Sequence, residues 1–348
     1  MNSTHSSEPR LGVIAGGNWI VDHVKVIDQW PDQDGLAIIA SQSSGNGGGS
    51  YNLLKNLSKM RCGFPLEGVG LVGRDEDGET ILEDCARHDI EKSQLHQTPD
   101  SPTSFTDVMT VSTTGRRTFF HQHGANAQLG IEHFNLSTSR ARIFYLGYLG
   151  LLRKLETLDA EQRTGASRLF EQATKLGMIT ISDLVSSDAA DFSEVIRPSL
   201  PHLDYLFLNE YELHRLTGGE KLRDAVKNLP AVEVMARDVL RRGVRRAVVV
   251  HFPESAVCVP RDADMLVQPS VRVPQKLIVG TAGAGDAFAA GFTFGLHEQW
   301  DWQRCLELGV AVAAVSLRAA TCSDAIQDWQ ECLAFARQLG FHDLPSRP

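Results

Sequence analysis

The 348-residue sequence lacks the features that mark several common classes of protein. It holds no run of about 18 apolar residues, so no membrane-spanning helix is expected. No two of its six cysteines stand in a C-x-x-C spacing, and a chain of this length needs no disulfides, so we expect reduced, mostly buried thiols in a cytoplasmic protein. Residues 1–10 are polar and Ser-rich, without the apolar stretch of a secretory signal, and we expect them to form a disordered tail.

Two nucleotide-binding patterns and one charge pattern are missing as well. No G-x-x-x-x-G-K-[ST] occurs, which excludes a Walker-type phosphate loop. The first apolar run ends in Ala15-Gly16-Gly17, without the G-x-G-x-x-G helix entry that a nicotinamide-dependent oxidoreductase needs. The net charge of −9 argues against nucleic-acid binding, because that binding depends on clustered Lys and Arg. We therefore expect neither a nucleic acid nor a membrane as a partner.

What the sequence does contain is an alternation of short apolar runs with segments of helical spacing. The runs are rich in Val, Ile and aromatic residues, a pattern typical of parallel strands covered on both faces. We therefore expect one α/β domain at 11–340, with helices on both faces of a mostly parallel central sheet (a three-layer αβα arrangement). The strands are expected at 11–15, 68–72, 142–146, 178–182, 205–208 and 246–251, and the helices at 159–176, 232–242, 285–297, 301–319 and 324–339.

Two segments, 18–44 and 103–122, interrupt this alternation with strand-like pieces that have no helix of useful length between them. Residues 105–112 and 117–121 are joined by a short turn that contains Gly115, and this pattern predicts a hairpin. We interpret the two segments as one small β-sheet that projects from the main domain. The uncovered edge of such a sheet would allow a homodimer.

The strongest chemical signal is the string GTAGAGDAF at residues 280–288, which leads directly into a helix. Gly and Ala let a ligand approach the backbone, and the first amides of a helix have no partner within it, so this turn predicts a site for a phosphate. Asp286 lies in the same turn and can take the proton of an attacking hydroxyl, as phosphoryl transfer requires. An isolated Asp would more simply cap the helix, but the complete string favours the base.

The fragment GAGDAF at 283–288 resembles the C-terminal signature of the ribokinase-like (PfkB) carbohydrate kinases. GNGGGSYN at 45–52, with a helix following at 53–60, resembles the family's N-terminal glycine motif, and NEYE at 209–212 resembles its N-x-x-E motif. The resemblance covers about residues 11–320. It implies a soluble kinase that uses ATP and Mg²⁺ to phosphorylate a hydroxyl of a sugar-like molecule, and it implies that the small sheet is a lid that excludes water.

The resemblance also implies a role for each matching residue. Asp286 would be the general base, and the backbone at 282–285 would form the anion hole for the γ-phosphate. Asn209 and Glu212 would lie near the ATP phosphates, with Glu212 organising Mg²⁺ through water. The other implied site residues are Gly283, Ala284 and Gly285 at the catalytic turn, Thr281 and Ala282 at the nucleotide, and Asn18, Asp22, Gly47, Gly48, Asn52 and Arg117 at the substrate.

Several of these residues have a simpler local explanation. Asn209 and Glu212 open a helix, so a cap with a first-turn acid explains them equally well, although the C-terminal end of a parallel strand is where open α/β sheets bind ligands. Arg117 would reach a negatively charged substrate group or stabilise the hairpin. His121 and His123 would face the same side of that hairpin. We expect them to face substrate or solvent, because a metal site would need further ligands.

Two departures from the family pattern qualify the expected function. Gly280 and Ala282 stand where relatives usually have Asp and Thr, and because that Asp often helps to bind a monovalent cation, activation by potassium is not expected. The sequence HFPESA at 251–256 replaces a glycine-containing turn near the nucleotide phosphates. These departures leave the alternative of a silent sugar- or nucleotide-binding protein, but the retained Asp286 favours activity. The pattern at 47–52 favours a sugar as the acceptor, with a nucleoside as the alternative.

Overall fold

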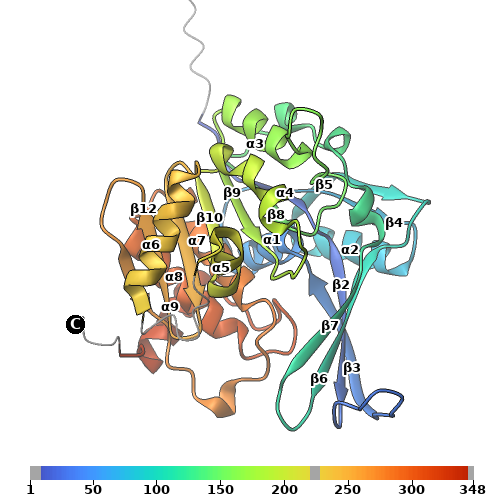
Figure 1. The fold of residues 1–348 in the computed structure, drawn as a ribbon. Helices are drawn as coiled ribbons and strands as arrows, with labels where there is room; N and C mark the ends of the chain where they lie inside the picture. The colour runs from blue at the N-terminus through green and yellow to red at the C-terminus, as the bar shows by residue number, and fades with distance from the viewer. Residues whose placement is uncertain (1–8, 220–227, 344–348) are drawn as a thin grey trace, which may run out of the picture.

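The computed structural model describes residues 9–219 and 228–343, so most of the expected tail at 1–10 lies outside the described residues. A nine-stranded sheet runs through the middle of the protein (Figure 1). Its strands, in spatial order, are β13 (Leu266–Pro269), β12 (Ser255–Pro260), β11 (Ala247–Phe252), β10 (Tyr205–Asn209), β9 (Ile179–Leu184), β8 (Ile143–Leu149), β1 (Val13–Gly17), β4 (Leu66–Gly73) and β5 (Ile90–Thr98). From β11 to β5 all neighbours pair in parallel, whereas β12 and β13 extend one edge in antiparallel pairing.

Helices cover both faces of this sheet, because successive side chains of a strand point to opposite faces. In β8, Ile143 and Tyr145 belong to one buried apolar cluster, and Phe144 and Leu146 belong to the other. The first cluster includes α1 (Gly49–Lys59), α2 (Glu76–Arg87), α7 (Ala284–His297), α8 (Trp302–Ser316) and α9 (Trp329–Leu339), and the second includes α3 (Gly165–Lys175), α4 (Phe192–Ile196), α5 (Glu210–Thr217) and α6 (Leu229–Arg241). The expected three-layer fold is confirmed.

Short 3₁₀ segments lie in the connections between these elements. They are η1 (Gly124–Gln128), η2 (Ile131–His133), η3 (Leu136–Thr138), η4 (Arg197–His202) and η6 (Gln275–Leu277). Within the described residues, no helix is long and apolar enough to cross a membrane. All six cysteines are free, as expected from their spacing.

A separate four-stranded sheet, here called the lid sheet, projects from the main body (Figure 1). Its strands, in spatial order, are β3 (Ile39–Gly47), β2 (Ile20–Ile27), β6 (Ser104–Val111) and β7 (Arg117–Gln122). The two interrupting segments therefore do form one sheet, as expected. Asp22 pairs in register with Thr106, and Thr106 pairs with His121, so these three side chains form a row on one face of the lid sheet.

Several boundaries differ from the expected ones, for identifiable reasons. Helix α3 begins at Gly165 and not at 159, because the Thr164 side chain accepts a hydrogen bond from the Ser167 N–H and caps the helix there. Strand β3 continues through the glycine motif, where Gly47 pairs with Ile20. Three further strands of the central sheet, β5, β12 and β13, have no counterpart among the expected ones. Edge strand β5 has many exposed polar residues and so lacks an apolar run, and β12 follows β11 after a turn of only two residues.

Candidate active site

The carboxyl ends of four neighbouring strands meet at one edge of the central sheet. Strands β8, β9, β10 and β11 are adjacent and parallel. Asn209 and His251 are neighbours in register at the ends of β10 and β11, and Asp183 pairs with Phe207 on β10. Tyr148 lies near the end of β8. Since open α/β sheets bind ligands outside the carboxyl ends of their strands, this edge is the first place to look for a site.

Asp286 faces these strand ends from the first turn of α7, where only 6% of its surface is exposed. The Tyr148 hydroxyl donates to its carboxylate, at 2.8 Å from Oδ1 and 2.9 Å from Oδ2. The Asn52 side chain donates from Nδ2 to Oδ2 at 2.8 Å. Asn46 Nδ2 donates in turn to Asn52 Oδ1 at 2.6 Å and to Ser323 Oγ at 2.8 Å. The carboxylate is thus held in place by side chains from α1, β3 and β8.

Burial raises the pKa of several carboxyl groups around this point. It raises the pKa of Asp286 to about 6, while the hydrogen bonds from Asn52 and Tyr148 act in the opposite direction. Burial, followed by the charge of Asp286, raises the pKa of Asp22 to about 7 and that of Asp183 well above its usual value. A carboxyl group with a pKa of about 6 is mostly ionised at neutral pH and is still basic enough to accept a proton.

Asp286 lines a cavity of about 690 Å³, here called the first cavity, a size typical of small-molecule sites. Its walls come from the lid sheet, the strand ends and the start of α7. The implied site residues that line it are Asp22, Gly48, Asn52, Asn209, Glu212, Thr281, Ala282, Gly283, Ala284, Gly285 and Asp286. The structure therefore brings together implied site residues from four separate parts of the sequence.

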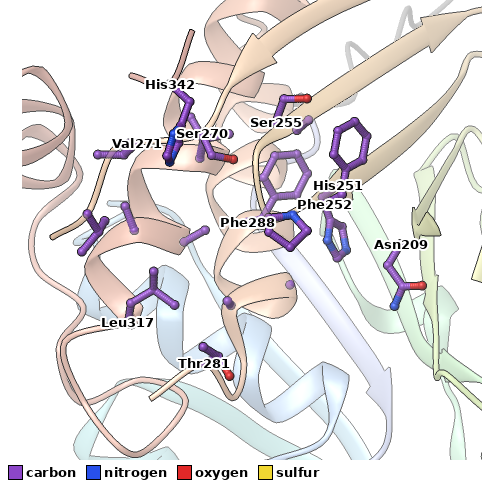
Figure 2. A pocket seen from close by; sticks show the side chains of 18 of the residues that line it. Asn209, His251, Phe252, Ser255, Ser270, Val271, Thr281, Phe288, Leu317 and His342 are labelled. Carbon is purple, nitrogen blue, oxygen red and sulfur yellow. The ribbon is translucent and has the colours of Figure 1, made fainter. Parts of the chain in front are cut away.

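A second cavity, of about 530 Å³, adjoins the first one. Figure 2 shows the apolar side chains of Val271 and Leu317 at one end of it, and Asn209 and His251 at the other. The two cavities share five lining residues, which mark the boundary between them: Asn209, His251, Thr281, Ala284 and Gly285. The first cavity is therefore the more polar of the two and contains the carboxylate, whereas the second has largely apolar walls.

Helix α7 begins at this boundary. Gly283, which precedes it, has a left-handed φ of 70°, and a Cβ at this position would lie 2.5 Å from the Cβ of Cys322, so only glycine fits. The first amides of a helix lack partners within it, and the helix dipole adds partial positive charge there. An anionic group that passes from one cavity to the other would meet these amides.

His251 lies at the same boundary, in the segment that departs from the family pattern. Its ring packs against Phe288, with a centroid distance of 5.4 Å, and burial lowers its pKa to about 4, so it is neutral at physiological pH. Pro253 lies in the turn between Phe252 and Ser255, which pair with each other. Its missing N–H therefore removes no hydrogen bond from the strand ladder.

Asn209 and Glu212 form the helix cap and also line the first cavity. Asn209 Oδ1 accepts from the Glu212 N–H at 2.8 Å, and Glu212 Oε2 accepts from the Asn209 N–H at 2.9 Å. Ser186 Oγ and Asn209 Nδ2 each donate to Glu212 Oε1 at 2.8 Å. Burial raises the pKa of Glu212 to about 7. The two explanations that the sequence left open are therefore compatible.

Three of the implied substrate residues are not among those that line the first cavity. Asn18 is fully buried, and its Oδ1 accepts a hydrogen bond from the Tyr148 N–H, so it holds the end of β8. Gly47 faces Asp22 so closely that a Cβ there would lie 2.4 Å from the carboxylate Oδ1. Arg117 lies next to the 280 position, at the edge of the site.

The surroundings of Gly280 do not fit a monovalent cation. A Cβ at this position would lie 2.4 Å from Nη2 of Arg117 and 2.7 Å from the carbonyl oxygen of Ala319. The Arg117 guanidinium therefore fills the space that a carboxylate side chain at 280 would need. Its Nε and Nη1 atoms are buried without a hydrogen-bond partner. A fixed positive charge stands here in place of an oxygen ligand.

The donors of the first cavity do fit Mg²⁺ bound together with a nucleotide. Among the described residues, no three or more His, Cys, Asp or Glu side chains form a group that could hold a metal by themselves. Mg²⁺ in phosphotransfer sites needs only one or two carboxylates, because phosphates and water supply the other ligands. Asp183 and Glu212 line the cavity, and Asp183 Oδ1 is buried without a hydrogen-bond partner.

Sequence reasoning missed Tyr148, Asp183 and Asn46. Tyr148 and Asp183 lie one or two residues beyond the expected strands at 142–146 and 178–182. The rule that the carboxyl ends of parallel strands line the ligand crevice would have found both of them. Asn46 reaches the site through its hydrogen bond to Asn52, and it also bonds Ser323, 277 residues away. It lies inside the motif at 45–52, but no local pattern signals the contact with Ser323.

Comparison with known proteins decides the family. The model of the pfkB family of carbohydrate kinases matches residues 17–329. This chain belongs to the pfkB family. The sequence resemblance is thereby confirmed, and so is the expectation that the protein is an enzyme of the carbohydrate kinase class.

Two relatives and two solved structures of other proteins each match most of the length of this pfkB protein. Adenosine kinase 2 of Arabidopsis thaliana is 21% identical over 311 residues, which are 86% of this chain and 84% of the relative. The ATP-dependent ribose-1-phosphate kinase of Halopiger xanaduensis is 26% identical over 326 residues, with 90% and 96% covered. Ribokinase of Thermotoga maritima has a TM-score of 0.76 at 23% identity, covering 94% of this chain and 99% of its own. Arabidopsis thaliana ribokinase complexed with ribose and ATP has a TM-score of 0.77 at 19% identity, with the same coverage.

Proposed function

We propose that this pfkB protein transfers the γ-phosphoryl group of ATP to a hydroxyl of a sugar, or to the sugar part of a larger small molecule. One observation carries this proposal: Asp286 stands in the first turn of a helix that begins at the boundary between two cavities. The first cavity would hold the acceptor alcohol. The second cavity would hold the nucleoside end of ATP against its apolar walls, so that the phosphates cross the boundary.

Asp286 would act as the general base. The acceptor oxygen attacks the γ-phosphorus, the bond from that phosphorus to the β–γ bridging oxygen breaks, the hydroxyl proton passes to the Asp286 carboxylate, and ADP leaves. A pKa of about 6 suits this role, because the group is largely ionised at neutral pH. Tyr148 and Asn52 keep the carboxylate in one orientation through the hydrogen bonds described above.

The start of α7 would stabilise the charge that develops on the transferred group. The backbone amides at 282–285 line the first cavity in the same turn as Asp286. Amides that are already oriented need no reorganisation when the transition state forms, and this is why such sites are effective. Neutral His251 lies at the same boundary and offers one further N–H donor.

Mg²⁺ would be held by Asp183 and Glu212 through water, together with the phosphates of ATP, and when bound it would neutralise phosphate charge. Mg²⁺ would also offset the repulsion between these carboxylates and the nucleotide. We further propose that the protein works in the cytoplasm, in line with its six free cysteines.

We also propose a homodimer formed through the lid sheet. Its outer surface exposes large apolar side chains, and the Trp30 and Phe120 rings stack on each other at 6.1 Å with an interplanar angle of 9°. Strand β3 is an edge strand, and most of its residues are exposed. An uncovered edge with apolar neighbours favours pairing with a second copy. The exposed apolar residues are Trp30, Leu36, Ile38, Ile39 and Phe120.

An ADP-release assay over a panel of sugars and nucleosides tests the kinase proposal. We expect turnover with at least one acceptor, and we expect Asp286→Asn to lower kcat by about 10²–10⁴, as removal of a positioned base does. Asp262→Asn, which changes an exposed loop residue, is the matched control and should leave kcat unchanged. Full activity of Asp286→Asn would refute the assigned base. Binding of ATP and an acceptor without any turnover in the native protein would favour the silent binding protein.

A further inference from the structure

A third cavity, of about 730 Å³ and here called the side cavity, continues the first cavity next to the lid sheet. His121, Leu151 and Ser187 line both cavities. Within the described residues, the side cavity shares no lining residue with the apolar second cavity, so it lies on the acceptor side of the site. A molecule with its reacting hydroxyl at Asp286 can therefore extend into the side cavity.

Two imidazole rings at the side cavity have ring nitrogens without partners. His121 and His123 lie edge to face, with ring centroids 5.0 Å apart. His121 Nε2 and His123 Nδ1 are both buried without a hydrogen bond. Burial lowers the pKa of His121 to about 4 and lowers that of His123 as well, so both rings are neutral at physiological pH. Buried polar atoms without partners are costly, and a ligand with complementary groups would satisfy them.

The row across the lid sheet links the hydrogen bond that His121 can offer to the ionisation of Asp22. Thr106 Oγ1 lies 3.0 Å from His121 Nδ1, and the Thr106 side chain also forms a hydrogen bond with Asp22. A hydroxyl carries one proton. When Asp22 is ionised it accepts that proton, and the Thr106 oxygen then accepts the Nδ1 proton of His121. The Nε2 atom of His121 then presents a lone pair. This atom can accept a hydrogen bond from a ligand donor such as an amino group or a ring N–H.

The other walls of the side cavity favour an uncharged group with apolar faces. Leu158 and Phe192 contribute apolar surface. Among the described residues that line the first cavity or the side cavity, Arg153 is the one Lys or Arg, whereas Glu156, Asp191 and Glu194 line the side cavity and further carboxyl groups line the first. A phosphate or carboxylate on the acceptor would therefore meet more negative than positive charge.

We propose that the side cavity binds the heterocyclic base of a nucleoside, with His121 and His123 as the residues that recognise it. The ribose would lie in the first cavity with a hydroxyl near Asp286. This inference rests on the proposed kinase function for the position of the ribose, and it replaces the preference for a free sugar that the pattern at 47–52 suggested. Recognition of the base does not depend on turnover and can be measured separately.

Calorimetric titration of the Asp286→Asn protein tests the inference without turnover. The titrants are adenosine, inosine, ribose and ribose 1-phosphate, each in the presence of a non-hydrolysable ATP analogue. We expect a nucleoside to bind at least about tenfold more tightly than ribose, and we expect ribose 1-phosphate to bind no better than ribose. Equal binding of ribose and the nucleosides, or tightest binding of ribose 1-phosphate, would overturn the inference.

Substitutions then assign the effect to the two histidines. We expect His121→Ala and His123→Ala each to lower the ratio of nucleoside affinity to ribose affinity by about tenfold, as loss of a hydrogen bond with its ring contact would. His96→Ala removes an exposed histidine on β5 and should leave the ratio unchanged. His123→Gln, which keeps a donor and an acceptor, should restore part of the ratio. A ratio unaffected by either alanine substitution would refute the assignment. Tight nucleoside binding by a native protein without ADP release would refute the kinase proposal alone.

Discussion

The Tyr148 hydroxyl lies within hydrogen-bond distance of both oxygens of the Asp286 carboxylate, at 2.8 and 2.9 Å. The two residues come from different elements, one from the end of β8 and the other from the start of α7, and both line the first cavity. Burial favours the protonated carboxyl group, whereas this hydrogen bond and the one from Asn52 favour the ionised group. The balance between the two effects sets the pKa of the proposed base.

Removing the Tyr148 hydroxyl should therefore shift the pH dependence of the reaction. In Tyr148→Phe the ionised Asp286 loses a donor, so its pKa rises above about 6. The base must be ionised to act, so the acidic limb of kcat/KM moves to higher pH. We expect activity a few-fold lower at pH 6.5, with most of it recovered at pH 8.5. Tyr205→Phe, at the far end of β10, is the matched control. A pH profile that superposes on that of the native protein would contradict this explanation.

Asp286 should also make the protein less stable at neutral pH than it would be without this carboxyl group. Burial raises its pKa from 3.8 to about 6, so between these values the folded protein keeps a proton that the unfolded chain has released. The free energy of unfolding therefore falls as pH rises through this window. Asp286→Asn removes this loss of stability, which is on the order of 3 kcal/mol above pH 6. Its melting temperature should exceed that of the native protein by a few degrees at pH 8 and by less at pH 4.5. A lower melting temperature at pH 8 would contradict this prediction.

The sequence was sufficient to predict six of the nine strands of the central sheet and the place of Asp286 at the start of a helix, because both depend on local patterns. The runs at 142–146 and 205–208 are apolar because helices cover both faces of these strands. The string GTAGAGDAF contains the glycines and small residues that precede a helix, so the start of α7 could be placed from the sequence. The network around Asp286 could not be predicted, because Asn46 and Ser323 meet across most of the chain. The position of Arg117 beside Gly280 likewise depends on how the lid sheet sits against the loop before α7.

The apolar outer surface of the lid sheet should mediate self-association. Phe120 is 51% exposed and Ile38 is 62% exposed, and both would be covered in the proposed dimer. We expect light scattering coupled to size-exclusion chromatography to give the mass of a dimer for the native protein and that of a monomer for Phe120→Glu. Val234→Glu is the matched control, because Val234 is 66% exposed but lies on α6. A native protein that stays monomeric at high micromolar concentration would rule out the dimer.

The Arg117 guanidinium should make the kinase independent of potassium. Its Nη2 occupies the space beside Gly280, so a positive charge is already present next to the turn that leads into α7. We expect kcat to change by less than about twofold between 100 mM choline chloride and 100 mM KCl, since a fixed cation needs no partner from solution. Stimulation of the native protein by KCl alone would contradict this view.

Variants at 117 and 280 distinguish the effect of the positive charge of Arg117 from the effect of the space that its side chain fills. Arg117→Met should lower kcat, and Arg117→Lys should retain part of the activity because it keeps the charge. The double variant Arg117→Ser with Gly280→Asp restores both the space and a carboxylate oxygen, and its activity should rise on addition of KCl. Arg116→Met changes the exposed neighbour in the same turn and should have no effect. If Arg117→Met is as active as the control, the guanidinium does not act on the reaction, and the lack of a potassium effect must have another origin.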